Sequence, residues 1–106
     1  AAGISMGARL GKWLDDPDIT LIGPSDRQFY QPGFTLIASG VYQPDVVWKK
    51  RSDCMPDCLK WIKDSVTAID PVSQTVSTAR TGTIKYDFLV LTPGLQLDWT
   101  QVEGIT

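Results

Sequence analysis

The apolar residues near the start of the chain follow the spacing of a helix. They recur every three or four positions between Ile4 and Leu14, so this segment is predicted to be helical. Gly3, Gly7 and Gly11 recur at every fourth position and therefore line one stripe of that helix. Each glycine costs a helix roughly 1 kcal/mol relative to alanine. We therefore expect the stripe to lie close against a sheet or against the backbone of a ligand.

A short apolar run, Ile19 to Ile22, follows the helix and is predicted to be a buried strand that ends at Gly23 and Pro24. A helix that leads directly into such a strand is the second half of a β-α-β unit, whose first strand would precede residue 1. Residues 23–58 show no clear periodicity and contain several prolines and glycines. They are expected to be mostly irregular, as a functional loop or as segments packed onto another part of the protein.

The second half of the chain is rich in β-branched residues. Runs at 59–69, 74–79 and 83–86 are separated by turn residues, which predicts a small antiparallel meander. The apolar run 86–91 suits a strand covered on both faces, as in a parallel sheet, and it ends at Thr92, Pro93 and Gly94. This order predicts an α/β fold class: a partial Rossmann-like dinucleotide-binding domain without its first strand, together with a small antiparallel β-meander.

The start of the helix is the candidate phosphate site. Ala1, Ala2 and Gly3 would be the last three positions of a G-x-G-x-x-G motif. In such a fold the glycines let the chain approach a pyrophosphate, which is held by the free N–H groups and the dipole of the helix N-terminus.

Composition narrows the chemistry that the chain can perform. It contains no histidine, which excludes Ser-His-Asp and Cys-His catalysis and any zinc site that needs imidazole. The formal charge of −2 argues against wholesale neutralisation of nucleic-acid phosphates. Two cysteines are too few for a disulfide-framed secreted module.

Four stretches carry a resemblance to a known family: Ala-Gly-Ile at 2–4, Pro-Ser-Asp-Arg-Gln-Phe-Tyr-Gln-Pro at 24–32, Trp-Ile-Lys-Asp-Ser-Val at 61–66, and Tyr-Asp-Phe-Leu-Val-Leu-Thr-Pro-Gly at 86–94. They look like the N-terminal region of the sulfide:quinone oxidoreductases, in particular the branch that includes the mitochondrial enzyme. The resemblance covers essentially all 106 residues. The Phe-Tyr-Gln-Pro element at 29–32 is its most specific part, because neighbouring flavoprotein families seldom have it.

This resemblance implies a flavoprotein with two dinucleotide folds that oxidises sulfide and passes two electrons through FAD to quinone. Residues 1–106 would be the N-terminal part of the FAD-binding fold, an internal piece of a longer protein. The residues that it implies for cofactor binding lie in five places: Ala1, Ala2 and Gly3 at the pyrophosphate, Pro24 and Ser25 beside the adenosine ribose, Gln31 near the FAD, Val66 at the adenine through its backbone, and Thr92, Pro93 and Gly94 against the cofactor.

One position departs from the family pattern. The family usually has Glu or Asp at the end of the second strand of this fold to accept the ribose hydroxyls, and this chain has Gly23 there. Hydrogen bonds to a charged group contribute roughly 1.5–3 kcal/mol each. Their loss is expected to weaken FAD binding unless Asp26 reaches back, and the change could also mark a nonfunctional relative.

Two further groups of residues invite a functional interpretation. Cys54 and Cys58 have C-x3-C spacing, but they match none of the positions of the family's redox cysteines, which lie beyond Thr106. They are interpreted as incidental loop thiols, with a redox or metal module as the alternative, and the segment alone is expected to be catalytically inactive. Lys49 to Arg51 could contact anionic lipid but is interpreted as a solvated turn.

Two other functions stay open beside the sulfide-oxidising flavoprotein. The first is a flavoenzyme of the same architecture, either an NADH:quinone oxidoreductase or a flavocytochrome-type sulfide dehydrogenase. The second is a Rossmann-like module that binds a nucleotide and performs no chemistry. By resemblance, the full-length protein would use sulfide and quinone as substrates and bind no nucleic acid. It would lie peripherally on the bacterial cytoplasmic or mitochondrial inner membrane through its C-terminal part.

Overall fold

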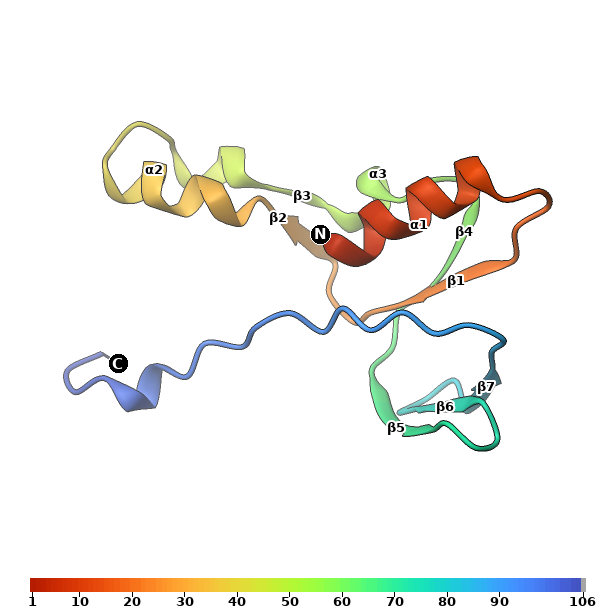
Figure 1. Ribbon diagram of the computed structural model, residues 1–106. Helices are drawn as coiled ribbons and strands as arrows, with labels where there is room; N and C mark the ends of the chain where they lie inside the picture. Colours follow the sequence, from red (N-terminus) through yellow and green to blue (C-terminus); the bar gives the residue numbers. More distant parts are fainter. Residues whose placement is uncertain (106) are drawn as a thin grey trace.

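The computed structural model describes residues 1–105 and shows a mixed arrangement of short helices and strands (Figure 1). The strands form three small sheets with the orders β1-β4, β2-β3 and β5-β6-β7. In chain order the elements are α1 (Ala2–Trp13), β1 (Ile19–Ile22), β2 (Arg27–Phe29), η1 (Gln31–Gly33), α2 (Phe34–Ala38), η2 (Pro44–Val47), β3 (Trp48–Lys50), α3 (Arg51–Cys54), β4 (Leu59–Ile62), β5 (Val66–Asp70), β6 (Thr75–Thr78), β7 (Thr83–Lys85) and η3 (Trp99–Gln101).

The predicted N-terminal helix is confirmed as α1, and its glycine stripe lies close against a sheet, as expected. A Cβ at Gly7 would lie 2.8 Å from a methyl of Leu59, which begins β4, and a Cβ at Gly11 would overlap Cys58 Sγ. A Cβ at Gly3 would lie 2.9 Å from Thr92 Oγ1. The missing side chains therefore let the helix approach the β1-β4 sheet and the segment around Thr92 more closely than alanine would allow.

The β1 strand has the predicted bounds and pairs in parallel with β4, with Ile19 opposite Leu59 and Ile22 opposite Ile62. The pairing continues beyond the last strand residues, because the Gly23 N–H donates to the carbonyl of Ile62 at 3.1 Å. Parallel pairing requires a crossover between the two strands. The prediction that residues 59–69 form one strand of the meander was wrong, since β4 belongs to this parallel pair.

A bend at Asp64 separates β4 from the true meander, β5-β6-β7. The two pairings in this sheet are antiparallel, with Ile69 opposite Val76 and Val76 opposite Ile84. Val76, on the central strand, is buried. The predicted antiparallel meander is therefore confirmed, with its first strand starting at Val66 instead of Leu59.

Residues 23–58 are more ordered than predicted. They contain a two-stranded antiparallel ribbon, in which Arg27 of β2 pairs with Lys50 of β3 and Phe29 pairs with Trp48, and four short helical segments. In Figure 1 the segment that contains α2 projects beyond the start of α1, whereas α3 lies alongside α1. Each element is three to five residues long, too short to show a periodicity in the sequence.

The strand predicted at 86–91 is absent. Residues 86–98 contain no helix or strand, and the Phe88 side chain is 93% exposed. A buried strand needs hydrogen-bonding neighbours on a sheet and cover on both faces. Within the described part of the chain no strand pairs with this run, so its apolar side chains stay at the surface.

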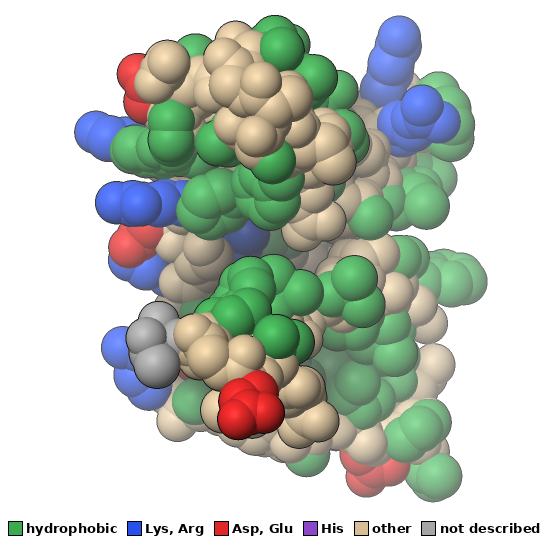
Figure 2. All heavy atoms as spheres, turned by 90° about the vertical axis from the view of Figure 1, so that its left-hand side faces the viewer, with side chains coloured by type: hydrophobic (Ala, Val, Ile, Leu, Met, Phe, Trp, Pro, Cys, Tyr) green, Lys and Arg blue, Asp and Glu red, His purple; other side chains and the backbone are tan. Residues whose placement is uncertain are grey.

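The hydrophobic core is small for the length of the chain. Among residues 1–105 the buried hydrophobic side chains are Val47, Leu59 and Val76. The radius of gyration is 16.5 Å, whereas a compact domain of this length would have about 13 Å. Figure 2 shows hydrophobic side chains exposed on one face of the molecule.

Candidate functional site

The segments predicted to bind a nucleotide meet at the carboxyl end of the parallel pair. Besides Thr92, the Cβ position at Gly3 has Leu21 of β1 as a neighbour, at 3.7 Å. Farther along the helix, Gly11 faces Cys58, just before β4 begins. Helix α1 therefore runs antiparallel to the two strands, and its N-terminus lies at the end where β1 leads into Gly23. Ligands of open α/β sheets bind at this edge.

The first turn of α1 has the properties of an anion-binding helix end. Ala1 is the N-cap residue, it makes no side-chain cap hydrogen bond, and the first turn contains no acidic residue. The first backbone N–H groups of the helix thus have no capping side chain, and no acidic side chain of the first turn competes for them. These features, and the absence of a side chain at Gly3, are compatible with a pyrophosphate at Ala1, Ala2 and Gly3.

The structure brings the Thr-Pro-Gly corner to this helix start. Thr92 lies beside Gly3, and Gly94 has a φ of +76°, a left-handed conformation that favours glycine. Pro93 lies between them in the same irregular segment. The sequence-based expectation that the helix start and this corner lie together is met, although the segment before the corner is not a strand.

The other predicted site residues lie on separate segments. Pro24 and Ser25 follow the carboxyl end of β1, where the Ser25 hydroxyl closes a turn by accepting from the Arg27 N–H at 3.2 Å. Val66 begins β5 after the Asp64 bend and is exposed. Gln31 begins the short helix η1 beyond β2 and is also exposed. None of these positions is in conflict with nucleotide binding, and their roles stay predictions.

Arg51 occupies the space beside Gly23 at the end of β1. A Cβ at Gly23 would lie 2.7 Å from an Nη atom of Arg51. The Gly23 carbonyl accepts a hydrogen bond from the Trp61 indole N–H at 3.0 Å. Asp26, which was the candidate substitute for the missing acid, directs its carboxylate to Lys63 instead. The end of β1 therefore presents a cation where an acid was expected.

The position of Arg51 was missed by sequence reasoning, which assigned Lys49 to Arg51 to a solvated turn. Lys49 and Lys50 are exposed, but Arg51 begins α3 and is only partly exposed. Its backbone N–H donates to the Asp26 carbonyl at 2.7 Å, which draws α3 against the loop after β1. No local sequence pattern encodes this contact, because the two residues lie far apart in the chain.

An open hollow of about 280 Å³ lies between the helix start and the β2-β3 ribbon. Ala1 and Ile4 line it on the helix side. Phe29, Tyr30 and Trp48 line it on the ribbon side, so its wall is largely apolar and aromatic. Such a hollow suits a flat ring system better than a second anion. Phe29 and Tyr30 were predicted either to wall the flavin pocket or to anchor a loop, and this geometry accommodates both.

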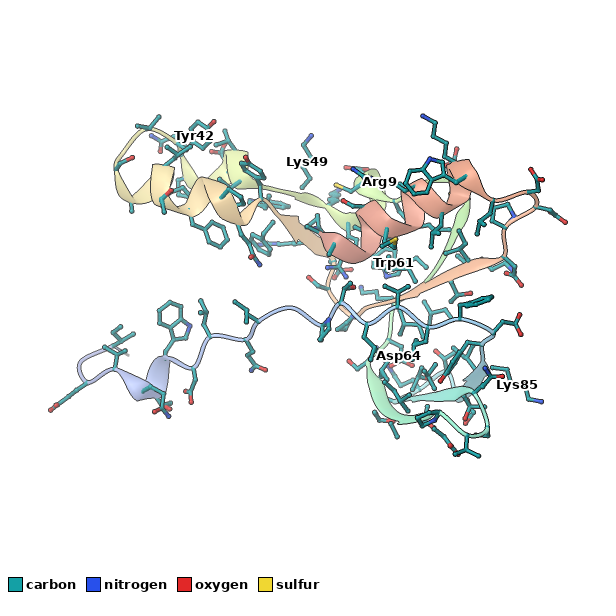
Figure 3. The ribbon with its side chains drawn as sticks, in the orientation of Figure 1. Arg9, Tyr42, Lys49, Trp61, Asp64 and Lys85 are labelled. Carbon is teal, nitrogen blue, oxygen red and sulfur yellow. The ribbon has the colours of Figure 1, made fainter. Side chains whose placement is uncertain are left out.

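Asp64 fixes the bend that leads from β4 to Val66 (Figure 3). Its side chain is 2% exposed and accepts from the backbone N–H groups of Ser65, Arg80 and Thr81 at 2.7 to 2.8 Å. Burial acts to raise the pKa of this carboxyl, but the hydrogen bonds from Arg80, Thr81 and Ser65 outweigh it and hold the pKa well below its ordinary value. Asp64 is thus a charged structural residue, and it was not predicted.

The structure gives little support to a redox site or a metal site at the two cysteines. Cys54 and Cys58 are free thiols, and Cys58 packs against the glycine stripe of α1. In the part of the chain that the structure describes, no cluster of three or more potential metal-binding side chains occurs.

The helices formed by residues 1–105 include none with the length and apolar character needed to cross a bilayer.

Comparison with known proteins gives consistent results. No protein-family model matches the chain. The mitochondrial sulfide:quinone oxidoreductase of Dictyostelium discoideum is 36% identical over 106 residues, and that of Mus musculus is 29% identical over 105 residues; each match covers 99% of this chain. These matches cover 24% and 23% of the two relatives, so the chain spans about a quarter of their length.

A solved structure supports the fold. The sulfide:quinone oxidoreductase of Aquifex aeolicus matches 81% of this chain and 20% of its own, with a TM-score of 0.67 and 24% sequence identity. The fold of this chain therefore resembles part of that enzyme. Over nearly its whole length, the chain is similar in sequence to the mitochondrial sulfide:quinone oxidoreductases.

Proposed function

We propose that this chain is the front part of an FAD-binding Rossmann-like domain in a flavoprotein that oxidises sulfide and passes the electrons to quinone. The observation that carries the proposal is the contact between Gly3 and Thr92 at the carboxyl end of the β1-β4 pair. It joins the start of a 12-residue helix to a Thr-Pro-Gly corner some ninety residues away. The similarity to sulfide:quinone oxidoreductases supports the choice of substrate class.

In this proposal the residues of the chain hold and orient the cofactor. The N–H groups of the first turn of α1 would bind the pyrophosphate, and Thr92, Pro93 and Gly94 would border the cofactor. Gln31 would lie near the FAD, Pro24 and Ser25 near the ribose, and Val66 at the adenine. Bound flavin would supply the two-electron chemistry. The cysteines that react with sulfide and the surface that contacts the membrane would lie in other parts of the protein.

A spectroscopic experiment tests this proposal on the full-length protein. The purified protein should be yellow, its flavin band should bleach on anaerobic addition of sulfide, and a soluble quinone should restore the band. A protein that retains flavin but is bleached only by NADH would favour an NADH:quinone oxidoreductase. A colourless protein that binds adenine nucleotides would favour the non-catalytic module, to which the absence of an acid at Gly23 lends support.

A further inference from the structure

Arg51 lies beside the end of β1, and its guanidinium has no anionic partner among residues 1–105. The ion pairs in this part of the chain all involve other residues. The Arg51 Nε atom is also buried and has no hydrogen-bond acceptor there. A buried donor without an acceptor is costly. A ligand that brings hydrogen-bond acceptors to this guanidinium would therefore be bound more tightly.

The guanidinium is held in place by the loop that follows β1. The Arg51 backbone N–H donates to the Asp26 carbonyl at 2.7 Å. An Nη atom of Arg51 lies 2.7 Å from the point where a Cβ at Gly23 would be. The guanidinium therefore takes the space that a side chain at position 23 would enter, directly after the last residue of β1.

The hydrogen-bond acceptors nearest this end of β1 are absent or already engaged. In dinucleotide folds an acid at the end of the second strand binds the 2′-hydroxyl of the adenosine ribose, and β1 is that strand in the proposed domain. Gly23 has no carboxylate, and its carbonyl already accepts from the Trp61 indole N–H. The Asp26 carboxylate pairs with Lys63. Because a hydroxyl can accept a hydrogen bond as well as donate one, the donors of Arg51 can take the place of the missing acceptor.

We infer that Arg51 is the ribose ligand of this site and donates to the 2′-hydroxyl of the adenosine ribose of FAD, in place of an acid at position 23. The inference rests on the proposed FAD-binding function and adds a specific residue to it. The direction of the hydrogen bond is reversed, because the ribose oxygen accepts from a guanidinium instead of donating to a carboxylate. The bond still has one charged partner, so it belongs to the stronger class of hydrogen bonds.

Two forms of the cofactor that differ in one hydroxyl test the inference by calorimetry on flavin-free full-length protein. FAD should bind about tenfold or more tightly than FAD whose adenosine ribose lacks the 2′-hydroxyl, because a hydrogen bond with a charged partner is lost. Arg51→Met should bind the two forms equally. Gly23→Glu added to Arg51→Met restores an acid and should restore the preference for FAD. Arg9→Met, which removes the same charge from an exposed position on α1, is the matched control and should leave the preference intact.

The outcomes separate this inference from the proposed function. Equal affinity of the wild-type protein for the two forms, or an unchanged preference in Arg51→Met, would overturn the role of Arg51 and leave the proposed function standing. Failure of the wild-type protein to bind FAD would overturn both. Loss of the preference in Arg9→Met would show a general effect of charge and refute the assignment to Arg51. Arg51→Ala, a second neutral variant, should also bind the two forms equally, and it decides the matter if Arg51→Met does not fold.

Discussion

The close contact between Gly11 of α1 and Cys58 gives a prediction whose size can be worked out. A Cβ at Gly11 would overlap Cys58 Sγ and lie 3.1 Å from Cys58 Cβ. Gly11→Ala gains about 1 kcal/mol of helix propensity but incurs an overpacking cost of about 1–3 kcal/mol. The net effect is a loss of local stability of up to about 2 kcal/mol. Cys58→Ala removes an exposed sulfur and should change stability by less than about 0.5 kcal/mol.

The double variant distinguishes overpacking from other causes. With the sulfur removed, Gly11→Ala keeps its helix propensity and loses most of the clash. The pair should therefore be about 1–3 kcal/mol more stable than the sum of the two single changes. Hydrogen exchange of the α1 and β4 amides in the full-length protein measures this as local opening free energy. If the free-energy changes of the two single variants sum to that of the double variant within about 0.5 kcal/mol, the close approach of the helix to the start of β4 is refuted.

Four other results are expected. Asp64→Asn should speed the hydrogen exchange of the Thr81 amide about tenfold or more. Because the folded pKa of Asp64 lies below its ordinary value of 3.8, the stability of the wild-type protein should fall as the pH drops below about 4. This loss of stability should be smaller in the variant, and acid titration followed by circular dichroism measures it. Gly3→Val should push the helix start away from Thr92 and reduce the flavin retained after gel filtration, and full retention would contradict the proposed site. Replacing both cysteines, Cys54→Ser with Cys58→Ser, should leave turnover of sulfide unchanged, whereas its loss would revive the redox module. The 106-residue chain alone, with its small core, should melt below the usual mesophilic range of about 45–65 °C, and calorimetry that finds a cooperative transition above it would count against this account.

Some elements could be predicted from the spacing of apolar residues and from the positions of proline and glycine. The helix could be read from its apolar spacing and from Pro17, and the strand Ile19–Ile22 from a β-branched run between turn residues. Both depend on neighbours along the chain. The failure at 86–91 has the opposite cause, because whether an apolar run becomes a strand depends on a pairing partner that lies elsewhere.

Some residues of the candidate site could likewise be predicted from local sequence, and others could not. Gly3 and the Thr-Pro-Gly corner were found because their residue types have a local conformational meaning. Arg51 was missed because its importance comes from a contact with Gly23, 28 positions earlier. Asp64 was missed for a similar reason, since the amides that it binds belong to Arg80 and Thr81. Long-range placement of polar groups leaves no periodic trace in the sequence.

The exposed run at 88–91 has a practical consequence for handling the protein. Phe88 is 93% exposed and Leu91 63% exposed, in a segment of high β-propensity without a charge. Exposed segments of this kind tend to pair with strand edges of other molecules and aggregate. Produced on its own in a bacterial cell, the chain should aggregate and collect in inclusion bodies. Asp or Lys in place of Phe88 should raise the soluble yield.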